Sequence, residues 1–196
     1  MVTNYLESLD KQFSYYKMLG EQTFDQLDDQ ALFFQPNEAS NSIAIIVKHL
    51  WGNMMSRWTN FLNSDGEKEW RNRDAEFEAD IKTREELLEK WEAGWTCLFE
   101  ALHSINKSNF GQTIYIRNMG HSISEAFNRQ LAHYAYHVGQ IVYVGRMIQN
   151  DQWKSLSIPK GGSKAYNDKK FSQPKRKEHF TAEFLKKQSE NFTDKK

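Results

Sequence analysis

The sequence predicts an all-α protein that folds as a four-helix bundle, with a long connection between the second and third helices and a basic C-terminal extension. Four stretches repeat apolar side chains at three- and four-residue spacing, which is the period of an amphipathic helix. Two of these stretches begin with a capping-box pattern. Aromatic residues make up 14% of the 196 residues, a proportion that indicates a packed core and excludes wholesale disorder.

The first two helices are predicted from their apolar faces. The first runs from about Thr3 to Leu27, and its face carries Leu6, Leu9, Phe13, Tyr16 and Gly20. A loop with breakers at residues 28–29 and 35–37 follows. The second helix opens at Asn41-Ser42, where a short polar side chain can accept hydrogen bonds from free backbone amides. Its stripe carries Ile43, Val47, Leu50, Met54, Trp58 and Phe61, and residues 63–66 end it.

The third and fourth helices are predicted from their starts. Residues 83–86 read Thr-Arg-Glu-Glu and residues 122–125 read Ser-Ile-Ser-Glu, so a hydroxyl and a carboxylate can cap two free amides reciprocally. The third helix carries Leu87, Leu88, Trp91, Trp95, Leu98 and Leu102, and the fourth carries Phe127, Leu131, Tyr134, Val138, Ile141 and Gly145 up to about Met147. The charged segment 67–82 predicts a long surface connection, and residues 110–116 a brief extended piece.

The net charge of zero is a cancellation between two parts of the chain. Residues 1–153 contain 14 basic and 21 acidic side chains, whereas residues 154–196 contain 12 basic and 5 acidic ones. We therefore expect a bundle over residues 1–153 and a basic extension over residues 154–196. A solvated extension, with one short helix over residues 181–187, is favoured over a nucleic-acid-binding arm because few aromatic residues are available for base stacking. Opposite charges would also let the extension fold back onto its own body or onto a partner subunit.

Several classes of protein are excluded by what the sequence lacks. A single cysteine, Cys97, allows neither an internal disulfide nor a cysteine-based zinc cage, and it is interpreted as a small buried hydrophobe. The N-terminal residues lack a signal-peptide pattern, and no apolar run approaches membrane-spanning length. We therefore expect a cytoplasmic protein with no membrane partner. The sequence contains no phosphate-binding loop, nucleophile elbow or nucleotide fingerprint.

The candidate chemistry lies in three histidines. His133 and His137 are four residues apart on the fourth helix, so both imidazoles project from one face and could hold a divalent metal ion, although such pairs also occur by chance. The zinc-protease motif is excluded because Tyr134 stands where that motif has a glutamate. His49 on the second helix is either a boundary histidine or a third ligand from a facing helix. The remaining histidines rank lower: His103, His121 and His179.

These residues carry a resemblance to a known family. Asn41-Ser42-Ile43-Ala44 leading to His49-Leu50, followed by His133-x-x-x-His137, resembles the DinB-like superfamily, which includes the YfiT-type metal hydrolases. Residues 128–141 (NRQLAHYAYHVGQI) and residues 157–161 (SIPKG) are similar to an uncharacterised bacterial subgroup, and the resemblance covers roughly residues 1–165. It implies an up-down-down-up four-helix bundle with a long connection between helices two and three. It also implies a metal site formed by His49, His133 and His137.

The resemblance also implies a class of reaction. Some relatives transfer low-molecular-weight thiols such as bacillithiol onto electrophiles, so the leading hypothesis is a metal-dependent thiol S-transferase that activates the thiol as thiolate. No carboxylate stands out in the sequence as a general base, which favours thiolate chemistry. The alternatives are a hydrolase that uses metal-activated water and a non-enzymatic, stress-associated binding protein with a structural metal.

Three further expectations accompany this hypothesis. Imidazole ligands accept zinc, nickel and iron(II), so the metal is not identified. Asn53, Gln130 and Gln140 lie about one turn from the histidines and are the candidates for orienting the rings. Relatives often form homodimers, and we expect the same here, with a small-molecule thiol or electrophile as substrate and no nucleic-acid partner.

Overall fold

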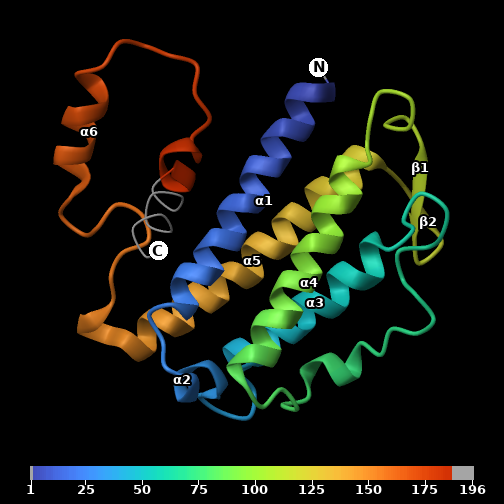
Figure 1. Cartoon of the computed structure of the whole chain (residues 1–196), viewed down its shortest axis with the longest axis horizontal. Coiled ribbons are helices and arrows are strands. Elements are labelled where there is room, and N and C mark those ends of the chain that lie inside the picture. The colour runs from blue at the N-terminus through green and yellow to red at the C-terminus, as the bar shows by residue number, and fades with distance from the viewer. Residues whose placement is uncertain (1, 187–196) are drawn as a thin grey trace.

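Four long helices dominate the computed structural model, which describes residues 2–186. These are α1 (Val2–Phe24), α3 (Ile43–Trp58), α4 (Arg84–His103) and α5 (Ile123–Gln149). Figure 1 shows α1 beside α5 and α4 beside α3, and further contacts join α3 to α5 and α1 to α4. The prediction of a mostly helical chain is confirmed. No helix in this part of the chain is both apolar and long enough to cross a membrane.

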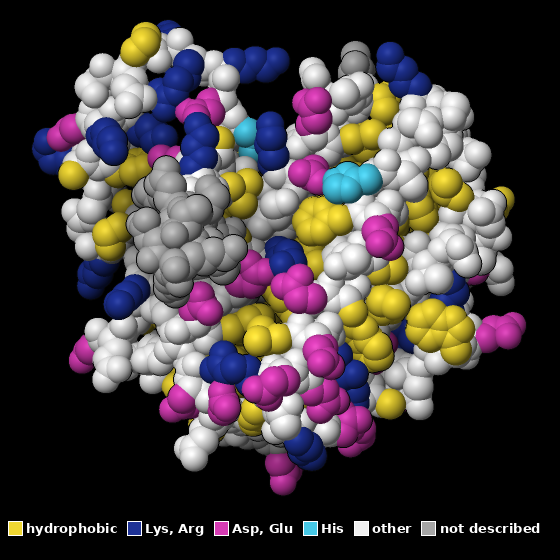
Figure 2. Space-filling view, viewed as in Figure 1, with side chains coloured by type: hydrophobic (Ala, Val, Ile, Leu, Met, Phe, Trp, Pro, Cys, Tyr) yellow, Lys and Arg dark blue, Asp and Glu magenta, His cyan; other side chains and the backbone are white. Residues whose placement is uncertain are grey.

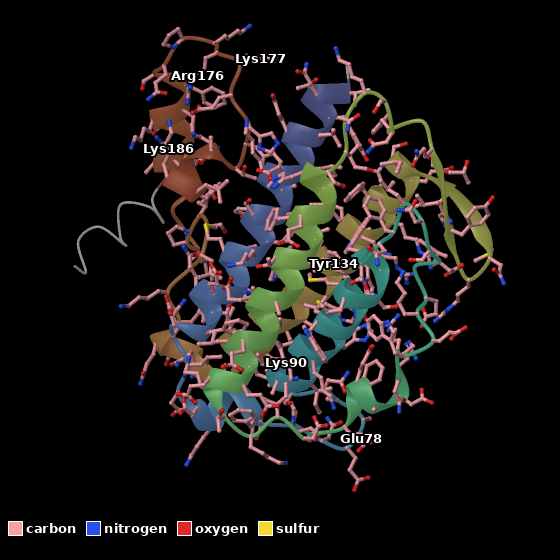
Figure 3. The ribbon with its side chains drawn as sticks, turned by 45° about the vertical axis from the view of Figure 1, so that its right-hand side comes forward. Glu78, Lys90, Tyr134, Arg176, Lys177 and Lys186 are labelled. Carbon is pink, nitrogen blue, oxygen red and sulfur yellow. The ribbon has the colours of Figure 1, made fainter. Side chains whose placement is uncertain are left out.

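An aromatic cluster fills the space between these helices. The Trp58 ring stacks on Phe127 with centroids 4.3 Å apart, and Phe13 packs edge-on against Trp95 at 6.4 Å. Tyr134 is fully buried among them, and its hydroxyl accepts a hydrogen bond from Trp58 Nε1 at 3.0 Å and donates one to Asn53 Oδ1 at 3.1 Å. Figure 3 shows Tyr134 in the interior of the helices. Burial of each large apolar side chain is worth roughly 1.5–3 kcal/mol, so the cluster makes a large contribution to the stability of the fold.

The helix starts follow the predicted capping patterns, with one difference. Ser122 and Glu125 form the complete capping box of α5: the Ser122 hydroxyl accepts from Glu125 N, and Glu125 Oε2 accepts from Ser122 N at 2.8 Å. The Thr83 hydroxyl caps α4 by accepting from Glu86 N at 3.2 Å, but Glu86 accepts from Lys82 N instead of closing the box on Thr83. The Ser42 hydroxyl caps α3 as expected.

Some boundaries differ from the predicted ones. The predicted loop after α1 contains a short helix, α2 (Asp29–Phe33), because the Asp28 carboxylate accepts a hydrogen bond from Ala31 N and so caps a helical turn. Helix α3 ends at Trp58, before the predicted Phe61, because Asn60 takes a positive φ of 48° that ends the regular helix. Helix α5 continues to Gln149, two residues beyond the predicted Met147.

A β-hairpin follows α4. Strand β1 (Thr113–Ile116) confirms the predicted extended piece in part, and it pairs antiparallel with β2 (Met119–Ser122), which the periodicity did not indicate. The turn residues Arg117 and Asn118 both have positive φ, which is the conformation of a two-residue hairpin turn. Asp65 fastens this turn, because its carboxylate accepts from the backbone N–H of Arg117 and of Asn118, each at 2.8 Å.

The segment between α3 and α4, residues 59–83, is here called the strap. It contains a short 3₁₀ helix, η1 (Asp74–Phe77). Two buried cations of α3 hold it: Lys48 Nζ donates to the Ala75 carbonyl at 2.5 Å, and Arg57 Nη1 donates to the Gly66 carbonyl at 2.9 Å. The predicted surface connection is therefore packed against α3 and brings part of its charged sequence into the interior.

The C-terminal part also packs against the body. After η2 (Asn150–Gln152) and α6 (Ser163–Phe171), residues 182–186 are helical, which agrees with the predicted short helix except for residue 187, which lies outside the described residues. Tyr15 of α1 contacts the rings of Phe180 and Phe184, with centroids 6.2 and 5.5 Å apart. Thr181 is fully buried, so the prediction of a solvated extension is wrong for this segment. Figure 2 shows Lys and Arg side chains gathered over this part and acidic side chains over the lower part of the same face.

Candidate metal centre

The structure brings the three predicted histidines together. His49 projects from the middle of α3, and His133 and His137 project from one face of α5. The distance between Nε2 atoms is 3.4 Å for His49 and His133 and 3.1 Å for His133 and His137. One candidate ligand atom from each of the three side chains lies within 4.8 Å of the other two. Two ligands about 2.0–2.1 Å from one tetrahedral ion are roughly 3.3 Å apart, so these spacings fit a shared divalent cation.

Two of the imidazoles are oriented by oxygen atoms behind them. His49 Nδ1 is 2.8 Å from Glu76 Oε2, and His137 Nδ1 is 2.8 Å from Gln140 Oε1. Since carboxylate and amide oxygens accept, each Nδ1 carries the proton and donates it. The Nε2 atoms of these two rings therefore present lone pairs toward the centre of the cluster, which is the arrangement that a metal ion requires.

Glu76 belongs to a buried chain of charges. Arg71 donates to both of its oxygens, through Nε at 2.7 Å and Nη2 at 3.0 Å, and also pairs with Glu67. The side chains of Arg71 and Glu76 are 3% and 5% exposed. Burial alone would raise the pKa of Glu76, but the hydrogen bonds from His49 and Arg71 outweigh it and lower that pKa, so the carboxylate stays ionised behind the His49 ring.

Burial keeps the other two imidazoles neutral. It lowers the pKa of His133 to about 3, with further lowering from the neighbouring His137 and His49. Burial likewise lowers the pKa of His137 to about 4, against the raising effect of its hydrogen bond with Gln140. A neutral imidazole has a free lone pair, so both rings are in their metal-ligating form at neutral pH.

The chemistry of the donor set also fits a cation. His133 Nδ1 is buried without a hydrogen-bond partner among the described residues, so in this cluster only its Nε2 atom has polar neighbours. The Phe77 ring of the strap stacks on the face of the His49 ring with centroids 4.9 Å apart. His49 is buried, whereas His133 and His137 are partly exposed, so the cluster lies at the edge of the core.

The orienting residues differ in part from those predicted. Gln140 does orient a histidine, but Asn53 accepts from the Tyr134 hydroxyl in the core instead. Gln130 is buried, and its Oε1 has no partner among the described residues. Sequence reasoning missed Glu76 and Arg71, since nothing in the spacing of a charged connection marks one carboxylate out of many.

The lower-ranked residues stay apart from this cluster. His103 pairs with Asp10 at 2.7 Å, and His179 contacts Ser8 at 3.2 Å. His121 contacts the Met119 carbonyl at 2.8 Å. The Cys97 thiol is half-buried, and burial raises its pKa, which agrees with its interpretation as a hydrophobe.

Comparison with known families identifies a match over most of the chain. The family described as "Protein of unknown function (DUF1572)" matches residues 1–162, a span that includes all three histidines and ends in the loop before α6. Among curated proteins, none matches the chain.

Proposed function

We infer that His49, His133 and His137 bind one divalent metal ion in this chain, which belongs to the DUF1572 family of proteins of unknown function. The same proposal assigns the family to the DinB-like superfamily, with the up-down-down-up arrangement of its four long helices. The metal site serves a metal-dependent transferase that moves a low-molecular-weight thiol onto an electrophile.

The observation that carries the proposal is the convergence of the three imidazoles. Two rings are held from behind by Glu76 and Gln140, so their Nε2 lone pairs point inward. Lone pairs at such separations repel one another, and a cation between them replaces that repulsion by coordination. Structural zinc sites have four protein ligands, whereas the described residues bring three to this cluster. Three ligands leave a position for a substrate.

A divalent cation held by three imidazoles would supply a Lewis acid that lowers the pKa of a thiol or of water at its open position. In thiol transfer, the thiol releases its proton to water, the thiolate sulfur forms a bond to the electrophilic carbon, and the bond from that carbon to the leaving group breaks, with its electron pair going to the leaving group. That reaction needs no separate base in the attack. The carboxylate that the strap brings to the site, Glu76, has both oxygens engaged by His49 and Arg71, so it orients a ring and is not free to take a proton from water. This engagement disfavours hydrolysis that depends on Glu76 as a general base.

The first experiment measures bound metal. Purified protein and the variants His49→Ala, His133→Ala and His137→Ala are analysed by elemental mass spectrometry after dialysis, with His103→Ala as the matched control outside the cluster. We expect about one metal ion per chain in the wild-type protein and in the control, and little in the three variants. Stoichiometric metal in all of the variants, or none in the wild-type protein, would contradict the proposal.

The second experiment measures the reaction. Metal-loaded protein is offered bacillithiol together with a chromogenic aryl halide, and formation of the thioether is followed by absorbance and mass spectrometry. We expect turnover above the uncatalysed rate that disappears with a chelator. Hydrolysis of an ester in place of thioether formation would identify water as the nucleophile. Stoichiometric metal without either reaction would indicate a structural ion in a binding protein.

A further inference from the structure

A groove runs along α5, and two of its lining residues, Tyr136 and Gln140, contact His137. It has a volume of about 600 Å³, within the range of small-molecule sites. One wall is the loop of residues 36–41, and the other is the α5 face that carries Tyr136, Gly139, Gln140, Tyr143 and Met147. We call this site the neutral groove, because of the composition of its lining.

None of the twelve residues that line the neutral groove has a charged side chain. Charged residues make up 27% of the chain, so a lining of this size without one is a distinct chemical environment. Glu38 belongs to the same loop but is not part of the lining. A carboxylate or phosphate in this groove would find no cation to pair with, which disfavours an anionic ligand.

The lining favours an aromatic ligand. Tyr136 is 63% exposed, Tyr143 is 71% exposed and Met147 is 47% exposed, although all three are large apolar side chains. Aromatic rings and thioethers make favourable contacts with a flat aromatic ligand. The amide of Gln140 adds polar atoms to the lining.

The neutral groove is connected to the candidate metal centre by two contacts. Gln140 lines the groove and accepts from His137 Nδ1 at 2.8 Å, and the Tyr136 ring contacts the His137 ring with centroids 4.9 Å apart. A ligand in the groove would therefore lie next to one of the three histidines.

We propose that the neutral groove binds an uncharged aromatic molecule, which is the electrophile of the thiol transfer. The assignment as electrophile rests on the proposed function, whereas binding in the groove rests on the lining alone. A low-molecular-weight thiol such as bacillithiol carries carboxylates, so it does not fit an uncharged lining and must reach the centre from elsewhere.

The test uses two probes of the same shape and different charge, 2-naphthylmethanol and 2-naphthoate, with binding measured by ligand-observed NMR. A Cβ added at Gly139 would meet nothing within 4 Å, so Gly139→Leu places a side chain in the groove from an open position, and Gly111→Leu is its control at another open glycine. Tyr143→Ala removes an aromatic wall six residues along α5 from His137, and Tyr115→Ala is its control on the hairpin. Metal content and melting temperature are recorded for every variant.

We expect 2-naphthylmethanol to bind the wild-type protein and both controls equally well. Its affinity for Gly139→Leu and for Tyr143→Ala should be lower by roughly tenfold or more. Equal binding by all five proteins, or tighter binding of 2-naphthoate, would overturn the proposal. A wild-type dimer that dissociates in Gly139→Leu, seen by sedimentation, would mean that a second copy occupies the groove and would also overturn it. Probe binding in protein that binds no metal would uphold the groove and refute only the proposed reaction.

Discussion

Replacing Glu76 by glutamine tests whether the strap tunes the candidate metal centre. The carboxylate accepts three hydrogen bonds, one from His49 Nδ1 at 2.8 Å and two from Arg71 at 2.7 and 3.0 Å. Glutamine keeps the shape but has one acceptor oxygen and an NH₂ group that cannot accept. If its oxygen takes the place of Oε2 and serves His49, its nitrogen takes the place of Oε1 and faces the Nε–H of Arg71, which can only donate.

The magnitude follows from those contacts. A partner that orients a histidine ligand is worth about 10–100-fold in metal affinity, or about 1.4–2.7 kcal/mol. We expect Glu76→Gln to weaken metal binding within that range, since the neutral amide no longer raises the basicity of His49. The free energy of unfolding should also fall by roughly 1.5–3 kcal/mol, because Arg71 loses a charge-assisted hydrogen bond in a buried site.

The assay is competition for zinc against a chromogenic chelator, with urea unfolding measured on the same samples. Glu78→Gln is the matched control: Glu78 lies two residues further along the strap, is exposed, and points away from the protein in Figure 3. The control should bind zinc as the wild-type protein does. Wild-type affinity in Glu76→Gln would refute the argument that this carboxylate acts on the metal through His49.

Three further predictions concern the same elements. A Cβ at Gly52 would clash with Glu76 Oε1, so Gly52→Ala should displace the carboxylate, although alanine itself favours a helix. We expect zinc binding to weaken about tenfold in the chelator assay. Unchanged affinity would show that Glu76 can move without disturbing His49. Burial would raise the pKa of Asp65, but hydrogen bonds from three backbone N–H groups outweigh burial and lower that pKa from its ordinary value of 3.8. The ionised carboxylate therefore stabilises the fold fully above pH 3.8, and this stabilisation is lost as the pH falls through the lowered pKa. Urea unfolding of the wild-type protein between pH 2 and 6 should show this loss of stability, and Asp65→Asn should not show it. Tyr134→Phe should cost roughly 1–3 kcal/mol in urea unfolding, because it leaves the indole N–H of Trp58 and the Asn53 oxygen buried without a partner, and a smaller loss would mean that water replaces the hydroxyl.

The features that were predicted well depend on residues close together in the chain. Ser122 and Glu125 are three residues apart, and the helix that they cap begins where the pattern places it. His133 and His137 are four apart on one helix, so their shared face follows from helical geometry alone. In both cases the local conformation determines the contact, so the spacing is sufficient evidence.

The hairpin and α2 were harder to predict because their signals are weak. Arg117 and Asn118 adopt positive φ without a glycine, since the Asp65 carboxylate binds their amides from 52 and 53 residues away. Helix α2 is only five residues long and depends on a single cap at Asp28. Neither has the long periodic stretch that identifies a helix or a strand from sequence.

The amino-acid sequence alone was enough to identify the helical class, the helix starts and a pair of histidines on one face, because each depends on contacts within a few residues. It could not select Glu76 from the many carboxylates of the charged connection, or show that this residue and Arg71 are buried behind His49. Nor could it show that the loop of residues 36–41 and one face of α5 enclose a groove without charge. Those contacts join residues that are distant in the chain, so they exist only where packing of the helices has brought the strap and the loop against α3 and α5.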